Sequence, residues 1–379
     1  MKHSIIYKMK KILFLFGTRP EAIKMAPLIH CFKNDINYHV KVAITAQHRE
    51  MLDQVINFFD IKVDYDLNIM KPNQTLSQLT SDLISKITHE ILLKESFDYV
   101  FVQGDTTTVL ASSLASFYQK IKVIHIEAGL RSHDIYSPFP EEMNRILTSK
   151  IAHIHFCPTQ TAFENLHNEN IKNNVFVVGN TVIDALLLGL NEIKKSSETN
   201  LINKYSSIDF NKKIILVTCH RRENFGKPFE EICDALLELS HSFKETIQII
   251  YPVHLNPNIL KIANEKLNRE NIKLVSPLDY PDLIWIMNRS DIILTDSGGI
   301  QEEAPSLGKP VLVLREITER MEGVEAGTAI IVGSKKEKIV AETTLLLTDV
   351  SYYSKISKAI NPYGNGTTSE KIKEILRDF

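Results

Sequence analysis

A short segment that reads Asp-Ser-Gly-Gly, at residues 296–299, has the residue types of a phosphate site. An apolar run precedes it and a helical pattern follows, which predicts a strand that turns into a helix. The start of such a helix has unpaired backbone N–H groups, and the helix dipole favours an anion there. Glycine lets a diphosphate approach the backbone, because a Cβ would keep it away. Glu302 or Glu303 would then reach a sugar hydroxyl beside the phosphate, although a plain tight turn is the alternative. The candidate phosphate ligands are Ser297, Gly298 and Gly299.

Acidic side chains follow three further apolar or rigid segments. Asp105 and Glu127 each come directly after an apolar run, and Glu141 opens a helical segment behind two prolines. From this segment alone, a helix cap is the favoured explanation of Asp105. Glu127 precedes Ala-Gly, where no helix start needs a carboxylate as its cap. Carboxylates crowded together shift each other's pKa values apart, which suits an acid/base pair.

Basic and histidine side chains follow the other apolar runs. Arg19 and Lys24 come after the first run, and a His-Arg-Arg segment at 220–222 opens the second half. His254 follows the next run, and Arg320 lies beyond a later one. His254 taken alone is more often structural, whereas the position of Arg19, Lys24 and the His-Arg-Arg segment directly after apolar runs favours binding over an ordinary surface role. Together they favour an anionic ligand, because cations gather at predicted strand ends.

Alternating apolar and amphipathic segments provide the scaffold for these side chains. Short runs that are apolar throughout indicate strands buried on both faces, and strict alternation with helices predicts doubly wound parallel sheets. A polar stretch, 194–213, reads as a surface segment between two such halves, with the strand ends of both facing a shared cleft. The predicted strands are 12–16, 39–44, 99–103, 122–126, 154–157, 175–178, 214–218, 247–251, 272–275, 292–294, 311–314 and 329–332. The predicted helices are 20–33, 50–59, 76–93, 107–118, 140–151, 161–168, 229–243, 258–267, 281–288, 300–307 and 337–347.

Composition limits the class of protein. The 379 residues suit two domains, and 44% hydrophobic with 24% charged residues is typical of a globular protein. A net charge of −2 gives no reason to expect nucleic acid or a membrane as a partner. Four cysteines without a CxxC pair indicate free thiols in a reducing compartment, and we expect a cytoplasmic protein. The apolar run after the basic first residues is too short for a signal peptide and reads as a first strand.

Taken together and in order, the motifs of this chain resemble the non-hydrolysing UDP-N-acetylglucosamine 2-epimerases of bacteria. The resemblance covers almost the whole chain, and the order of the motifs is highly specific. The motifs are GTRPEAIKMAP (17–27), TAQHREMLDQV (45–55), GDTTT (104–108), IEAGLRS (126–132), YSPFPEEMNR (136–145), GNTVIDAL (179–186), HRRENFG (220–226), YPVHLNP (251–257), TDSGGIQEEAPSLGKPVL (295–312) and NPYGNG (361–366).

The resemblance implies a fold, a substrate and a set of site residues. The fold would be GT-B, with one Rossmann-like domain at 1–178 joined by a returning helix at 363–379, and a UDP-binding domain at 179–362. The partners would be UDP-N-acetylglucosamine, UDP and a second copy of the chain, and neither NAD nor a metal is expected. The catalytic set would be Asp105, Glu127, Glu141 and His220. The substrate-binding set would be Arg19, Lys24, Arg222, His254, Ser297, Gly298, Gly299, Glu303 and Arg320.

Two segments bear on finer properties of that family. Gln47 and His48 match the segment through which many members bind a second, activating UDP-N-acetylglucosamine. Met321 stands where the family usually has proline, directly after Arg320. Loss of that proline would loosen the loop that carries Arg320.

The implied reaction inverts C2 of the sugar and yields UDP-N-acetylmannosamine for cell-surface polysaccharide. The C2 hydrogen has no ring carbonyl beside it, so direct abstraction is too hard. A nicotinamide route would need a GxGxxG fingerprint, and the segment after the first run has one glycine. Elimination of UDP to a 2-acetamidoglucal and re-addition is the remaining route, with carboxylates as bases. The alternatives are a hydrolysing 2-epimerase, a GT-B glycosyltransferase and a UDP-sugar sensor without activity.

Overall fold

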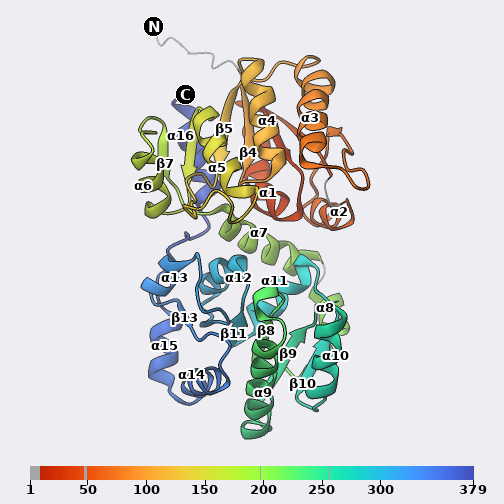
Figure 1. Ribbon diagram of the computed structural model, residues 1–379, viewed down its shortest axis with the longest axis vertical. Helices are drawn as coiled ribbons and strands as arrows, with labels where there is room; N and C mark the ends of the chain where they lie inside the picture. Colours follow the sequence, from red (N-terminus) through yellow and green to blue (C-terminus); the bar gives the residue numbers. More distant parts are fainter. Residues whose placement is uncertain (1–8, 47–48, 197, 255) are drawn as a thin grey trace. The chain divides into compact units, whose positions relative to one another are not determined.

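Buried apolar runs build two separate parallel sheets, each in its own unit of the chain (Figure 1). The computed structural model describes residues 9–46, 49–196, 198–254 and 256–379. Unit 1 contains the chain up to Ala185 together with Gly364–Phe379, and unit 2 contains Leu186–Tyr363. The predicted doubly wound parallel sheets are therefore confirmed.

The sheet of unit 1 has seven strands in the order β3-β2-β1-β4-β5-β6-β7, and neighbours pair in parallel. The inner strand β1 is fully buried from Ile12 to Phe16, as a continuous apolar run predicts for a strand covered on both faces. The strands are β1 (Lys10–Phe16), β2 (Tyr38–Ile44), β3 (Tyr65–Asp66), β4 (Tyr99–Gln103), β5 (Lys122–Ile126), β6 (Ile154–Cys157) and β7 (Val175–Val177).

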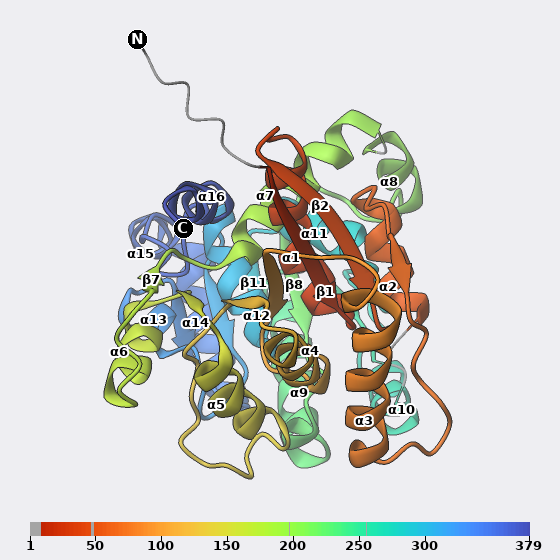
Figure 2. The same ribbon diagram turned by 90° about the horizontal axis from the view of Figure 1, so that it is seen from above.

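Helices flank the sheet of unit 1 on both faces. The π-helix η1 continues α3, and α3, α4 and α5 lie beside one another in Figure 2. The C-terminal helix α16 packs against α1, where the amide N–H groups of Thr368 and Ser369 donate to the Asp184 carboxylate. The helices are α1 (Arg19–Lys33), α2 (Arg49–Phe58), α3 (Leu76–Lys86), η1 (Ile87–Leu92), α4 (Thr107–Tyr118), α5 (Glu141–Ile151), α6 (Gln160–Asn168) and α16 (Thr368–Arg377); α7 (Thr181–Ser196) runs from unit 1 into unit 2.

The sheet of unit 2 repeats the same winding with six strands, in the order β10-β9-β8-β11-β12-β13. Ile292, Ile293 and Leu294 at its centre are fully buried. The strands are β8 (Lys213–Thr218), β9 (Ile247–Pro252), β10 (Ile272–Val275), β11 (Ile292–Thr295), β12 (Val311–Val313) and β13 (Ala329–Ile331). The helices are α8 (Glu198–Lys204), η2 (Arg222–Asn224), α9 (Lys227–Ser242), α10 (Pro257–Lys266), α11 (Tyr280–Arg289), α12 (Gly298–Glu303), η3 (Ala304–Leu307), α13 (Met321–Glu325), α14 (Lys336–Thr348) and α15 (Val350–Ser357).

The structure differs from the sequence-based expectation in several short elements. The polar stretch at 194–213 is not a plain surface segment, because α8 forms within it and buries Leu201. The 16-residue helix α7, the two-residue strand β3 and the short helices α13 and α15 add to the predicted elements. Cys157, Cys219 and Cys233 are buried free thiols, and Cys31 is half-buried. Within the described residues, no helix is both long and apolar enough to cross a membrane.

Candidate active-site residues in the two units

Glu127 lies at the carboxyl end of β5 in a strained and heavily bonded position. Its φ is 63°, a left-handed value that costs energy for a residue with a side chain. The side chain is buried, and Lys24 Nζ from α1 donates to its Oε1 at 2.7 Å. Gln103 Nε2 and Asn180 Nδ2 donate to the same carboxylate. Two residues that the sequence assigns to separate roles, Glu127 and Lys24, thus form one buried ion pair.

Asp105 follows β4, the neighbour of β5, and it is not a helix cap. Thr106 is the N-cap of α4, and its Oγ1 accepts from Val109 N at 3.4 Å. The Asp105 carboxylate instead pairs with Arg145 Nη2 at 2.7 Å and keeps a side-chain exposure of 26%. Asn144 Nδ2 holds the Asp105 carbonyl at 2.9 Å. The carboxylate is therefore fixed in place and still open to a ligand.

Two buried groups that the sequence did not single out support these acids. Glu21 accepts from Gly17 N and Thr18 N, both at 2.7 Å, and from the Thr106 hydroxyl at 2.6 Å. Burial raises the pKa of Glu21, although these donors act against that rise. His125 on β5 lies 2.8 Å from the Gly104 carbonyl through Nε2, and burial lowers its pKa to about 4. Both residues brace the turn that carries Asp105.

Glu141 and Arg19 occupy the first residues of α5 and α1, where each side chain is partly exposed. Glu142, the residue next to Glu141, is buried, and its carboxylate accepts from Arg145 Nη1 at 2.9 Å. Arg145 consequently joins Glu142 to Asp105. Gln47 and His48 lie outside the described residues.

In unit 2, the Ser-Gly-Gly turn opens α12 as the sequence predicts. Ser297 is the N-cap, and within the described residues its side chain makes no capping hydrogen bond to the helix. The Arg320 guanidinium lies against the turn, since a Cβ built on Gly298 would meet its Cζ at 3.3 Å. Arg320 is held there by Glu302, whose Oε1 accepts from its Nε at 2.7 Å. The sequence-based expectation is that Met321 loosens the loop that carries Arg320, but in the structure Arg320 lies against this turn.

Glu303, the other acid of α12, is buried. The Tyr280 hydroxyl donates to its Oε1 at 3.1 Å. Both acids after the glycines therefore have partners in the protein, and Glu303 Oε2 is 3.9 Å from a Cβ built on Gly299. This places the Glu303 carboxylate directly beside the turn.

The histidines of unit 2 lie next to each other. The rings of His220 and His254 are 6.3 Å apart between centroids and 17° from parallel. His220 is half exposed, and His254 Nδ1 accepts from Asn256 N at 3.1 Å. Arg222 begins η2, and its side chain lies outside the description.

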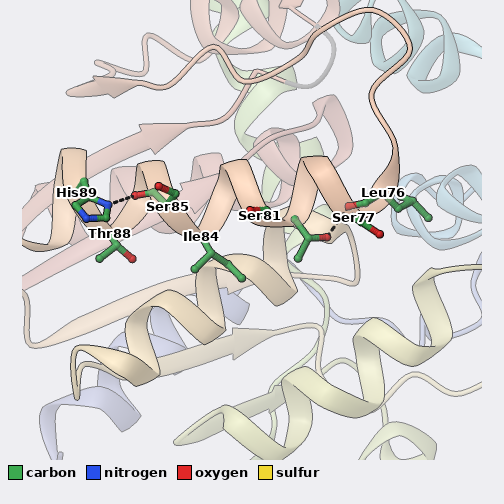
Figure 3. A pocket seen from close by; sticks show the side chains of 8 residues that line it. Leu76, Ser77, Ser81, Ile84, Ser85, Thr88 and His89 are labelled. Atoms are coloured by element: carbon green, nitrogen blue, oxygen red, sulfur yellow. Dashed lines mark hydrogen bonds between the residues drawn. The ribbon is translucent and has the colours of Figure 1, made fainter.

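A cavity of unit 1 lies away from these residues. It has a volume of about 780 Å³ and runs along α3 and η1, from Leu76 to His89 (Figure 3). Serine and threonine side chains make up most of its lining, and none of the predicted site residues contributes to it. Across the part of the chain that the structure describes, no group of three or more His, Cys, Asp or Glu could hold a metal ion.

Comparison with known proteins points to the family that the sequence motifs resemble. A family model described as UDP-N-acetylglucosamine 2-epimerase matches residues 30–377. The chain is 52% identical to the UDP-N-acetylglucosamine 2-epimerase of Escherichia coli (strain K12), over 97% of this chain and 98% of that protein.

Solved structures agree with these matches. The UDP-GlcNAc 2-epimerase of Neisseria meningitidis bound to UDP-GlcNAc is 50% identical, with a TM-score of 0.87 and coverage of 97% of this chain and all of that one (100%). The Methanocaldococcus jannaschii enzyme in complex with UDP-GlcNAc and UDP is 35% identical, with a TM-score of 0.78 and coverage of 97% and 100%. The predicted GT-B fold class, with two Rossmann-like parallel-sheet domains, is confirmed.

Proposed function

The chain belongs to the UDP-N-acetylglucosamine 2-epimerase family, and on this basis we propose that it interconverts UDP-N-acetylglucosamine and UDP-N-acetylmannosamine without net hydrolysis. The observation that carries the proposal is the pair of acids after adjacent strands. Asp105 follows β4 and Glu127 follows β5, and both are fixed by basic partners. Acids held in this way are suited to proton transfer at a sugar carbon.

The proposed reaction is an elimination followed by its reverse on the other face. A carboxylate takes the C2 proton, the electrons of the C2–H bond form a C1=C2 double bond, and the C1–O bond electrons leave with UDP. The products of this step are UDP and 2-acetamidoglucal. A protonated acid then delivers its proton to the opposite face of C2 while UDP adds back to C1. No oxidant and no net water enter the balance.

The acids of unit 1 fit the two proton transfers. Glu127 is buried beside Lys24, which favours the charged, proton-accepting carboxylate. Asp105 and Glu141 are more exposed and provide further acids for the opposite face.

The groups of unit 2 fit the leaving nucleotide. The Ser-Gly-Gly turn has no side-chain cap from Ser297 within the described residues, and Arg320 lies against it. Amide donors with a nearby guanidinium stabilise the negative charge that builds on a departing diphosphate. Glu303, beside the same turn, would hold a ribose hydroxyl, and Arg19, Arg222, His220 and His254 complete the proposed set.

Product analysis tests the proposed reaction. Purified protein incubated with UDP-N-acetylglucosamine alone should form UDP-N-acetylmannosamine, and with deuterium oxide as solvent the C2 proton signal of both sugars should disappear. Proton and phosphorus NMR follow both changes. UDP with free N-acetylmannosamine would indicate the hydrolysing reaction, turnover only with an added sugar acceptor would indicate a transferase, and no turnover at all would indicate a sensor.

We further propose that the protein acts as a homodimer in the cytoplasm. Large apolar side chains are exposed where η1 and α4, which pack together, both end: Leu93, Phe117 and Tyr118. Exposed apolar patches of this kind mark interaction sites, and the family resemblance implies a second copy as the partner. Light scattering after gel filtration should give twice the mass of the chain, and Phe117→Asp should halve it. Ile36→Asp, at an exposed apolar residue between α1 and β2, should leave the dimer intact, whereas a wild-type monomer would contradict the proposal.

A further inference from the structure

Asp296 is the first residue of the Asp-Ser-Gly-Gly segment, and its carboxylate is fully buried. The proposed reaction gives it no role. Asp296 ends the segment that leads from β11 into the Ser-Gly-Gly turn. One oxygen, Oδ2, accepts three hydrogen bonds: from His220 N and Arg221 N at 2.9 Å and from Asn224 Nδ2 at 3.0 Å. These bonds offset the cost of burying the charge.

The other oxygen of Asp296 is turned towards an imidazole. Within the described residues, Oδ1 accepts no hydrogen bond, although it is buried. It lies 3.4 Å from His220 Nδ1. An unsatisfied buried carboxylate oxygen is costly, so its placement beside a ring nitrogen requires an explanation.

The loop that carries His220 is rigidly tied to the end of β11. The hydroxyls of Thr218 and Thr295 lie 2.6 Å apart, and Asp296 N donates to the Thr218 carbonyl at 3.1 Å. The buried hydroxyl of Tyr251, on the neighbouring strand β9, donates to the Cys219 carbonyl at 3.1 Å. The backbone of His220 therefore has a fixed position relative to the Asp296 carboxylate, while the ring itself is 49% exposed and open to a ligand.

From this geometry we propose that Asp296 is a positioning residue that fixes the proton of His220 on Nδ1 and leaves Nε2 to face the substrate. A carboxylate can accept a hydrogen bond but cannot donate one, so it selects the Nδ1–H form of a neutral imidazole. When Nε2 takes a proton, the carboxylate lies beside the resulting positive charge. The role of His220 at the departing diphosphate rests on the proposed function, whereas the tautomer does not.

His254 is the neighbouring group that could compete for this role. Its ring stacks over His220 rather than meeting it edge to edge, and its Nδ1 already accepts from Asn256 N. Cys219 precedes His220, but burial beside Asp296 raises the pKa of its thiol well above the ordinary value, so it remains a neutral group. Asp296 is thus the carboxylate that faces Nδ1.

The ¹⁵N spectrum of His220 in the ligand-free protein tests the tautomer directly. In the wild type, we expect the chemical shifts of a protonated Nδ1 and an unprotonated Nε2 above the pH at which the ring is charged. In Asp296→Asn, the carboxamide oxygen can keep the three bonds of Oδ2, which places the –NH₂ group opposite Nδ1. Because –NH₂ donates, the tautomer should invert to Nε2–H. A wild-type ring with its proton on Nε2, or an unchanged tautomer in Asp296→Asn, would overturn the proposal.

Kinetics provides the second readout and a matched control. Asp296→Asn should lower kcat about 10- to 100-fold with KM changed by less than about threefold. Asp291→Asn is the matched control. Asp291 lies at the other end of β11, and its carboxylate also accepts from a backbone N–H. This substitution should leave kcat unchanged. In a His220→Gln background, Asp296→Asn should cost no further activity, and an additive loss would overturn the proposal. If the wild type shows no turnover, the proposed function fails, but the NMR result still decides the tautomer.

Discussion

Glu127 illustrates how single residues in this protein depart from ordinary local preferences. A left-handed backbone at a residue with a side chain costs about 1 kcal/mol or more and persists only where the surroundings enforce it. Here Lys24, Gln103 and Asn180 all bind the carboxylate and fix its direction. Strain of this kind is concentrated at functional sites, which agrees with a role for Glu127 at the reacting carbon.

A test at the same scale is Asp105→Asn. The substitution removes the proton-transfer group but leaves the fold, because Arg145 still pairs with Glu142 and Asn144 still holds the backbone carbonyl of residue 105. We expect kcat to fall by about 10²- to 10⁴-fold, as is typical when a general acid or base is removed. UDP affinity, measured by calorimetry, should stay within about twofold of the wild type, because Asp105 is not among the proposed nucleotide ligands.

Asp98→Asn is the matched control, since Asp98 precedes β4 while Asp105 follows it. Asp98 accepts from Lys11 N at an exposed position, so its loss should leave turnover unchanged. A near-normal rate in Asp105→Asn would remove this residue from the mechanism. An equal loss in both variants would indicate damage to β4 instead of loss of chemistry.

Individual acids could be predicted from the sequence, but their partners could not. Asp105 and Glu127 are visible because they follow apolar runs directly. Arg145 pairs with Asp105 from a helix 40 positions later, and Asn180 reaches Glu127 from 53 positions away. Such pairs depend on how the strands are ordered in the sheet, and no local pattern carries that information. The same reason hid the contact between Asp296 and His220.

At the scale of elements, the buried face of β5 makes the fold sensitive to acid. His125 on this strand has a pKa of about 4, below its ordinary 6.5, because burial disfavours the charged ring. Between these two values the unfolded chain binds a proton that the folded chain does not. The free energy of unfolding should therefore fall as the pH drops below 6.5, and the loss levels off below about 4.

This effect can be isolated with His125→Gln, whose amide N–H can replace Nε2 as donor to the Gly104 carbonyl. From pH 7 to pH 5, we expect the wild type to lose about 2 kcal/mol more unfolding free energy than the variant. Urea unfolding followed by circular dichroism at both pH values measures the difference. His241→Gln, at an exposed histidine, should behave like the wild type. The same pH dependence in His125→Gln and the wild type would contradict this interpretation.

Most of the elements that are long or fully buried were predictable, but the 16-residue helix α7 was not predicted. Continuous apolar runs identified β1, β4, β5, β8 and β11 because both faces of these strands are covered. Two residues of β3 and five of α13 are too few to establish a period. The sequence did not predict α8, because this short polar helix buries Leu201 alone and so has no apolar stripe. Tertiary contacts, and not local pattern, stabilise these short elements.

At the scale of the whole molecule, two sheets of the same winding support different chemistry. Unit 1 presents acids after β4 and β5, and unit 2 presents a glycine turn, an arginine and two histidines. This difference between the residues of the two units was predictable, because the residues that follow parallel strands gather at one edge of the sheet. The difference fits the proposed elimination, in which the acids would act on the sugar and the cationic groups on the leaving nucleotide.

Positional isotope exchange tests this elimination most directly. Deuterium at C2 would also enter by a route through a 3-keto sugar, whereas cleavage of the C1–O bond is unique to loss of UDP. UDP-N-acetylglucosamine that carries ¹⁸O in the oxygen between C1 and the β-phosphorus should be incubated with the protein and recovered for phosphorus NMR. We expect the label to move into the non-bridging β-phosphoryl positions as UDP-N-acetylmannosamine forms. Epimerisation with the label retained entirely in the bridging position would contradict the elimination of UDP.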